Sequence, residues 1–557
     1  MNKLLVQDKG FKKEKGGGAN YSNYIVEGFG LTLYDRKNSL FEYSLTGWVL
    51  KSDSKSFAGR TVKDLMSVLK KLCKKYKLTQ YTAMKKDVLV IYTNRLRELH
   101  AYLKEYITSS FNIDEDSKLN ADFDDDKAYF QVLDFIEFRK CWDEDKITAR
   151  QIQHWAYDMW TYLFFTEDKK VYLTPNSVTR NKIKLACKKT KCTLGVDIFP
   201  STLVKYKFYK KAAHGGICYF DKRGYKEGPI IEYDLTSAYT YCYTLPLPIT
   251  KGEFLDEALW DKTDKLTIGT YRLTFKNTAK QLSTIKDIDD KTFDVSGEEV
   301  TQVFRLTSVD LQTIKKFATI INIECETLMG FEAGQLPQEY LDVLVGFFLK
   351  KQTTKGGERA VWKVGLNGIS GNSIKNIETD KEFDSYNHKE LVPQWGAFII
   401  SYCRQIVCDT GLQLKGWYYS DTDCVYCKDT KANRKLIDKW NEQAQVHNKE
   451  LCEKFGYDYE VLKDLGTFKV EAEITRMKII GNKHYCYETK DHKVVVKAAG
   501  CDKKTMDKSN IFELDEMPIG QKECAFVYTK NKGYARFTTK DKKIYKLWLV
   551  MQEMFFS

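Results

Sequence analysis

The sequence lacks the features that mark secreted and membrane-spanning proteins. Its first ten residues, MNKLLVQDKG, have no long apolar run behind the lysine, and no stretch of about 18 apolar residues occurs anywhere in the 557 residues. We therefore expect a cytoplasmic protein, in the host cell if its source is a virus, with no membrane partner. In that setting the 15 cysteines indicate reduced thiols and not a disulfide framework.

Zinc-ribbon spacing and internal repeats are also absent from the sequence. Neither Cys187 with Cys192 nor Cys424 with Cys427 has a second pair at the spacing of a zinc ribbon. Cys424 and Cys427 also lie in an apolar strand-like run, where alternate side chains point to opposite faces. The sequence therefore disfavours a structural zinc site.

Length and charge indicate a large protein with a polyanionic partner. A chain of 557 residues predicts about two to four structural units. The formal net charge of +13 favours nucleic acid, because Lys and Arg that neutralise phosphates release condensed counterions. The 35 Tyr and 31 Phe could stack on bases, although such rings are core residues just as often. An ordinary basic protein stays open as the alternative.

Strand-like and helical patterns alternate over the first 190 or so residues, which predicts an α/β domain. The strand-like runs are 24–33 and 88–92, and the helical patterns are 62–77, 95–107 and 148–165. After residue 195 the order changes. A strand at 230–234 precedes a β-rich region to about residue 331, followed by helices at 337–351, 358–369 and 395–410 and a hairpin at 417–426.

Three aspartates stand at the ends of strand-like runs. Asp421 and Asp423 lie at the tip of the predicted hairpin, and Asp234 ends an apolar strand. Close carboxylates repel one another, so a divalent cation is the usual reason to gather them. Two-metal phosphoryl transfer needs this arrangement, since one ion lowers the pKa of the attacking hydroxyl and both stabilise the developing charge. The alternative is an Asp-Thr-Asp turn that only bonds its own backbone amides.

Basic side chains recur on one side of the predicted helices. Lys351, Arg359 and Lys363 are eight and four residues apart, and Asn367 follows one turn after Lys363. Such a face predicts a clamp for a triphosphate, and a solvated helix face is the alternative.

These segments resemble four motifs of family B DNA polymerases, in the order of that family. Asp234 to Tyr239 resembles motif A (Asp-x-x-Ser-Leu-Tyr-Pro), Lys363 to Gly371 resembles motif B (Lys-x-x-x-Asn-Ser-x-Tyr-Gly), Tyr419 to Cys424 resembles motif C (Tyr-x-Asp-Thr-Asp-Ser), and Lys483 to Tyr485 resembles the Lys-x-Tyr motif. The chain length and the long interval between motifs A and B are similar to those of the protein-primed, phi29-like branch. The resemblance implies an α/β and α+β multidomain fold, with an RNase H-like exonuclease-type N-terminal domain and a right-hand polymerase of palm, fingers and thumb.

The resemblance also implies a division of the chain into segments. These are an exonuclease-like domain at 1–190, the first part of the palm at 191–250, an insertion at 251–335 that resembles a terminal-protein region, fingers at 336–376, a short second insertion at 377–394, the second part of the palm at 395–505 and a thumb at 506–557.

By the same resemblance, each motif residue has an expected role. Asp234 and Asp423 would bind two Mg²⁺ ions, for which Mn²⁺ could substitute, with Asp421 assisting and the Leu235 carbonyl as a further ligand. Tyr239 would exclude a ribose 2′-hydroxyl. Lys363, Lys351 and Arg359 would hold the triphosphate, and Asn367 would line the nucleotide pocket. Lys483 and Tyr485 would contact the primer end. Gly215 and Gly216 would contact the DNA and belong to a linker motif that has Ala213 in place of tyrosine.

The sequence departs from the family pattern at several positions. Motif A has Ala238 and Thr240 where Leu and Pro are usual, and motif B has Gly368 and Ser370 where Ser and Tyr are expected. The ring that would wall the incoming base is therefore missing, and we expect altered base selectivity. The segment 376–394 is shorter than the hairpin insertion of this branch, which predicts weaker processivity and strand displacement.

The exonuclease motifs are incomplete. Asp8 stands where the first carboxylate is expected, but glycine replaces the second, and the later motifs retain Asn94, Glu98 and Asp158. Two ions need more carboxylate oxygens than these residues offer. The sequence predicts a degenerate exonuclease domain that still binds single strands.

The motifs together predict a DNA-templated DNA polymerase, acting as a monomer on primer–template DNA and deoxynucleotides. The resemblance implies priming by a terminal protein during replication of a phage or a linear mobile element. Two alternatives stay open: an RNA-templated or template-independent nucleotidyltransferase on the same palm, and a nucleic-acid-binding or priming factor that does not extend DNA.

Overall fold

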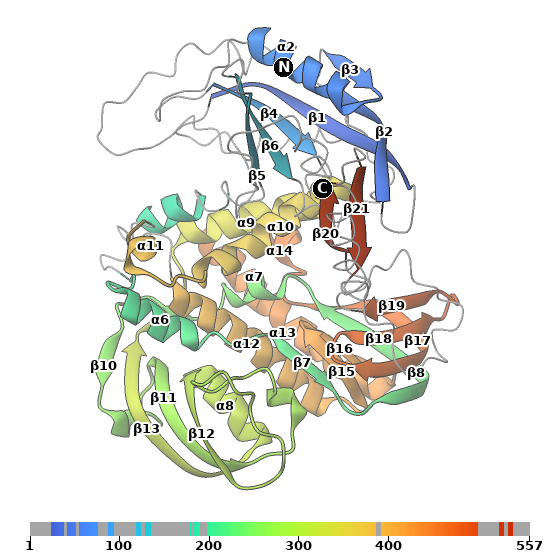
Figure 1. Cartoon of the computed structure of the whole chain (residues 1–557). Coiled ribbons are helices and arrows are strands. Elements are labelled where there is room, and N and C mark those ends of the chain that lie inside the picture. The colour runs from blue at the N-terminus through green and yellow to red at the C-terminus, as the bar shows by residue number, and fades with distance from the viewer. Residues whose placement is uncertain are drawn as a thin grey trace, which may run out of the picture. The chain divides into compact units, whose positions relative to one another are not determined.

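The structure is a computed structural model of the whole chain, and Figure 1 shows its helices and strands. It describes residues 24–37, 42–51, 55–75, 87–93, 118–123, 128–134, 179, 182–189, 198–385, 392–498, 523–528 and 533–538. The chain divides into a first unit (Met1–Thr179, Thr353–Gly365 and Gly520–Ser557) and a second unit (Arg180–Gln352 and Leu366–Ile519). Within the described ranges, no helix combines the length and the apolar character needed to cross a membrane.

The first unit is built on an eight-stranded sheet in the order β20-β21-β2-β1-β4-β6-β5, with β3 paired to β2. The elements are β1 (Tyr24–Lys37), β2 (Glu42–Lys51), β3 (Ser56–Gly59), α2 (Val62–Lys75), β4 (Asp87–Thr93), β5 (Lys118–Phe123), β6 (Ala128–Asp134), β20 (Glu523–Tyr528) and β21 (Gly533–Thr538). β2 runs antiparallel to β1, whereas β4 runs parallel to β1 and β6 parallel to β4. The alternation of patterns in the sequence correctly predicted an α/β unit.

Helix α2 shows how local sequence produces this layer. Thr61 and Asp64 cap its first turn, since the Thr61 hydroxyl accepts the Asp64 N–H at 3.1 Å and the Asp64 carboxylate accepts the Thr61 N–H at 3.2 Å. Leu65, Leu69 and Leu72 recur at helical spacing and are buried. The predicted helices at 95–107 and 148–165 lie outside the described residues.

The second unit is built on a seven-stranded sheet in the order β19-β18-β17-β8-β16-β15-β7. Its strands are β7 (Ile217–Phe220), β8 (Gly224–Leu235), β15 (Trp417–Thr422), β16 (Cys424–Lys428), β17 (Phe468–Gly481), β18 (His484–Thr489) and β19 (Val494–Ala498). β8 and β16 are central. Most side chains of β16 and of the second half of β8 are buried, and in the sequence these segments are the apolar runs beside Asp423 and Asp234.

Helix α12 (Pro393–Gln413) forms the core behind this sheet, and the predicted helix at 395–410 lies within it. It contacts β15, β16 and the short helices α6 (Leu203–Lys211) and α7 (Ala238–Cys242). Gly411 permits the close approach, because a Cβ at this position would lie 2.5 Å from the Trp417 ring. α13 (Lys431–Phe455) also packs on the sheet, beginning at a Thr430 cap and ending at Gly456, whose φ is 72°.

The insertion between motifs A and B folds around its own core. The strands β10 (Glu253–Leu255), β11 (Leu266–Lys276), β12 (Val300–Thr307) and β13 (Thr319–Phe331) form a sheet in the order β10-β13-β11-β12, with α8 (Ser308–Phe317) beside it. Its buried rings Phe275, Phe293 and Phe304 pack against one another, and the Phe293 and Phe304 rings are stacked. The β-rich region that the sequence predicts up to about residue 331 contains β11 and β12, which pair antiparallel (Figure 1).

Two further helices follow the insertion, α9 (Gln338–Thr353) and α10 (Gly356–Ser373), close to the predicted bounds. The division between the two units falls within α10. α11 (Asp380–Ser385) follows in the segment expected as a short second insertion. In the segment expected as the thumb, the described residues are β20 and β21, and β21 pairs with β2 in the sheet of the first unit.

Candidate active site

The two predicted metal-binding aspartates lie at neighbouring strand ends. Asp234 is near the end of β8, and Asp423 is the turn between β15 and β16. Asp234 is the register partner of Cys424, and the Leu235 N–H donates to the Asp423 carbonyl oxygen at 2.8 Å. Antiparallel pairing of β8 with β16 therefore brings together the backbones of two aspartates that lie far apart in the sequence.

The motif C turn has a strained backbone. Thr422 has a φ of 68°, which is rare for a β-branched residue and costs on the order of 1–3 kcal/mol. The turn is held by the Asp423 N–H, which donates to the Asp421 carbonyl oxygen at 2.9 Å, and by Gly216, where a Cβ would lie 2.9 Å from the Thr422 methyl carbon. Strain of this kind is typical of functional sites.

Asp421 pairs with the lysine of the Lys-x-Tyr motif. The Lys483 ammonium lies 3.2 Å from the Asp421 carboxylate, and the Lys483 N–H donates to the Tyr419 hydroxyl at 2.9 Å. Tyr485 is buried, with its hydroxyl 3.0 Å from that of Tyr426. The exposed member of the motif is therefore Lys483, and the contact of Tyr485 with the primer stays a prediction.

Lys351 reaches the turn that follows Asp234. Its ammonium donates to the Ser237 hydroxyl at 2.6 Å, and Ser237, with a φ of 51°, begins α7. Tyr239 follows on α7, where burial raises its pKa above the ordinary value and the charge of Asp423 adds to the effect. The predicted triphosphate ligand Lys351 and the predicted sugar gate Tyr239 thus flank the same turn.

The other predicted nucleotide-binding residues lie on α10. Arg359, Lys363 and Asn367 are all exposed, and Lys363 and Asn367 are one helical turn apart. Arg359 and Lys363 belong to the first unit and Asn367 to the second. Ser370, at the position of the motif B tyrosine, is buried close to Tyr243.

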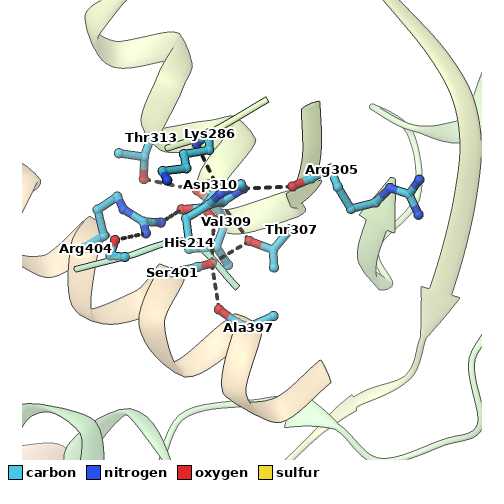
Figure 2. Close-up of polar contacts among 11 residues, drawn as sticks. His214, Lys286, Arg305, Thr307, Val309, Asp310, Thr313, Ala397, Ser401 and Arg404 are labelled. Carbon is cyan, nitrogen blue, oxygen red and sulfur yellow. Dashed lines mark hydrogen bonds and ion pairs between the residues drawn. The ribbon is translucent and has the colours of Figure 1, made fainter. Parts of the chain in front are cut away.

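A buried polar network anchors the predicted linker residues, as Figure 2 shows. The Arg404 guanidinium is fully buried, pairs with Asp310 of α8 and donates to the Gly215 carbonyl oxygen at 2.5 Å. The Ser401 hydroxyl also lies against Asp310, at 2.7 Å. These bonds tie α12 to the insertion and to the segment that supports Thr422.

His214 extends this network without carrying charge. It bonds the Arg305 carbonyl oxygen at 2.8 Å through Nε2 and accepts the Lys286 N–H at 3.3 Å through Nδ1. Burial lowers the pKa of His214 to about 4, so that the neutral imidazole bridges the linker segment and the insertion.

Sequence reasoning missed both Arg404 and Asp310. Arg404 is the single charged residue from 393 to 408, in an otherwise apolar helical run. A buried guanidinium needs a carboxylate partner, so this pattern could have revealed the pair, but it could not have identified Asp310, which is 94 positions away.

The donor set at the aspartates fits magnesium. In the described part of the chain, no three His, Cys, Asp or Glu side chains lie close enough together to hold an ion. Asp234 and Asp423 offer carboxylate oxygens, and Mg²⁺ usually takes one or two carboxylates and completes its shell with water and substrate phosphates. Asp8, Asn94, Glu98 and Asp158, the expected remnants of the exonuclease site, lie outside the described residues.

Solved structures that are similar to this one include DNA polymerases. No protein-family model matches the sequence, and no curated protein matches it either. The structure of phi29 DNA polymerase complexed with primer–template DNA is similar, with a TM-score of 0.62 and 16% identity, covering 87% of this chain and 94% of that chain. The ternary complex with incoming nucleotide gives the same values.

A third structure, phi29 DNA polymerase complexed with single-stranded DNA, matches with a TM-score of 0.63 and 16% identity, covering 92% of this chain and 99% of that chain. The chain therefore has a mixed α/β, multidomain DNA polymerase fold. The particular fold is that of phi29 DNA polymerase, which the resemblance in motifs, chain length and motif spacing predicted.

Proposed function

We propose that this chain is a DNA-templated DNA polymerase that extends a primer hydroxyl by two-metal nucleotidyl transfer. One observation carries the proposal: Asp234 and Asp423, distant in the sequence, lie at paired strand ends in a fold shared with phi29 DNA polymerase. In the structures that are similar, that protein holds primer–template DNA and incoming nucleotides.

The aspartates would hold the metal ions. When bound, one Mg²⁺ ion would lower the pKa of the primer hydroxyl, and both ions would stabilise the charge of the in-line displacement. Asp234 and Asp423 supply carboxylate ligands, with the Leu235 carbonyl as a further one. Asp421 already pairs with Lys483, so its proposed role is to orient that lysine beside the metal ligands.

The nucleotide would lie against the turn after Asp234. Lys351, which contacts Ser237 there, would hold the triphosphate. Arg359 and Lys363 are assigned the same role, and Asn367 the nucleotide pocket, from the sequence pattern. Tyr239 would sit under the sugar, where its ring would leave no room for a 2′-hydroxyl.

The primer would be held by the Lys483 ammonium and by the segment at Gly215 and Gly216. Gly216 lies against the Thr422 side chain, so the backbone can pass close to the motif C turn. Tyr485 is assigned a supporting role below Lys483, because its side chain is buried.

We also propose that synthesis starts on a terminal protein. The insertion has its own sheet and core, and it exposes apolar side chains that include Phe254, 68% exposed, and Ile321, 49% exposed. Exposed apolar surface of this kind suits a protein partner. For the first unit we propose a degenerate exonuclease: strand order and direction in β3-β2-β1-β4-β6 suit an RNase H-like domain, while the carboxylate set in the sequence is incomplete.

Single-nucleotide incorporation on defined templates tests the main proposal. With Mg²⁺ and a DNA primer, we expect incorporation of the deoxynucleotide complementary to a DNA template and little on an RNA template. Incorporation that ignores the template base, or that prefers RNA, would replace the proposal with one of the two transferase alternatives. Binding of primer–template without any incorporation would favour a non-extending binding factor.

A further inference from the structure

A buried carboxylate lies beside the proposed metal ligands and has no part in the proposed chemistry. Glu232 precedes Asp234 by two positions on β8, so both side chains lie on one face of the sheet. Glu232 is 8% exposed, and its carboxylate accepts hydrogen bonds from the hydroxyls of Tyr426 and, at 3.2 Å, Tyr487. Burying a carboxylate costs free energy, so a carboxylate in this position, beside the proposed metal ligands, indicates a specific role.

Hydrogen-bond direction links Glu232 to Tyr485. The Tyr426 hydroxyl donates its hydrogen bond to the Glu232 carboxylate. Only the lone pairs of the Tyr426 oxygen then remain for the Tyr485 hydroxyl, 3.0 Å away. Tyr485 must therefore donate to Tyr426. The carboxylate orients both hydroxyls in one direction, which an apolar residue at position 232 would not do.

Ring packing carries the link from Tyr485 to the turn at Lys483. The Tyr485 and Tyr419 ring centroids are 4.4 Å apart, and both rings are buried. The Tyr419 hydroxyl accepts the Lys483 N–H at 2.9 Å. The packed tyrosine rings are thus joined, through the Tyr419 hydroxyl, to the backbone of Lys483, whose ammonium pairs with Asp421.

Lys483 needs this support because its backbone is strained. Its φ is 60°, a left-handed conformation that is unfavourable for a residue with a side chain. Such a conformation persists only where surrounding contacts hold it. The bond from the Lys483 N–H to Tyr419 is one such contact, and it depends on where the Tyr419 and Tyr485 rings sit.

We propose that Glu232 is a positioning residue: through Tyr426, Tyr485 and Tyr419 it holds the turn at Lys483 so that the lysine is presented to the primer end. This inference rests on the proposed polymerase function for its consequence, but its structural step can be tested separately. It predicts that loss of Glu232 weakens the hold on the primer and leaves nucleotide binding unchanged.

The test compares four single variants of the full-length chain. Glu232→Val removes the carboxylate that accepts from Tyr426, and Tyr426→Phe removes the hydroxyl that joins Glu232 to Tyr485. Glu232→Gln keeps an oxygen that accepts from Tyr426. Tyr487→Phe is the matched control, because it removes the other hydrogen bond to Glu232 without touching the bond between Tyr426 and Tyr485.

Two measurements are made on each variant. In steady-state incorporation, we expect Glu232→Val and Tyr426→Phe to raise the KM for primer–template about tenfold, with the KM for deoxynucleotide within about twofold of wild type. We expect Glu232→Gln and Tyr487→Phe to keep the KM for primer–template near the wild-type value. In hydrogen–deuterium exchange, the peptide that contains Lys483 exchanges faster in the first two variants only.

The results that overturn the proposal are equally specific. Equal effects of Tyr487→Phe and Tyr426→Phe, or unchanged exchange at Lys483 in both Glu232→Val and Tyr426→Phe, would mean that Glu232 only stabilises the sheet. If Glu232→Val does not fold, Tyr426→Phe decides. If wild type never incorporates nucleotide, the polymerase proposal fails, while the exchange data and the affinity for primer–template still decide the role of Glu232.

Discussion

The Leu235 N–H donates to the Asp423 carbonyl oxygen at 2.8 Å, which joins the end of motif A to the turn of motif C. This bond ties the backbones that carry Asp234 and Asp423, so sheet pairing, and not a flexible loop, sets how far apart the two residues lie. A metal site on paired strands is pre-organised, which two-metal chemistry requires.

Replacing either aspartate should abolish extension. We expect Asp234→Ala and Asp423→Ala to lower Mg²⁺-dependent incorporation by about a thousandfold or more, because each removes a ligand that stabilises transition-state charge by several kcal/mol. Affinity for primer–template, measured by fluorescence anisotropy, should stay near wild type. Asp438→Ala, an exposed aspartate on α13, is the control and should extend normally. Normal extension by Asp423→Ala would contradict the metal assignment.

Tyr239 should decide between deoxyribose and ribose. Its side chain is half-buried near Asp423, so a smaller side chain would open space at the proposed sugar position. We expect Tyr239→Val to increase ribonucleotide use relative to deoxynucleotide by about tenfold to a hundredfold in kcat/KM. Tyr239→Phe, which keeps the ring, should not change the ratio. An unmoved ratio in Tyr239→Val would place the gate at another residue.

The buried pair of Arg404 and Asp310 should be important for stability. Arg404→Met leaves a buried carboxylate uncompensated, and we expect it to lower the free energy of unfolding by about 3–5 kcal/mol. The double variant Arg404→Met/Asp310→Leu should recover most of this loss. The control lies on the same two helices: Lys316 pairs with Asp409 at 2.6 Å, each 38% exposed, and Lys316→Ala should cost less than about 1 kcal/mol.

Denaturant titrations followed by circular dichroism would measure these differences. A double variant that is no more stable than Arg404→Met would show that the pair does not act as a unit.

Removing the insertion should separate initiation from extension. Deleting residues 255–325 also removes Asp310, so the deletion must carry Arg404→Met to avoid an unpaired buried charge. We expect this variant to retain some extension of a DNA primer and to lose transfer of the first nucleotide to a partner protein, seen as labelled nucleotide on a denatured protein band. Wild type that never forms this band with its candidate partners, yet extends DNA primers, would contradict protein priming.

The sequence by itself determined the order of the motifs and much of the local structure. The apolar strand before Asp234, the hairpin around Asp423 and the helices near 337–351, 358–369 and 395–410 were all predicted within a few residues. These features depend on the periodicity of apolar residues and on turn composition, which neighbouring residues encode. The motifs, together with the chain length and the long interval between motifs A and B, also predicted the phi29 polymerase fold, which the structural comparisons confirm.

Only the tertiary structure decided which distant side chains meet. Sheet register placed Glu232 opposite Tyr426, chain topology buried Arg404 against Asp310, and the turn at Lys483 brought its ammonium to Asp421. The pairing of β21 with β2 likewise joins the two ends of the chain in one sheet. Such contacts depend on register and on loop closure over long intervals, and a one-residue slip would turn every strand side chain to the other face.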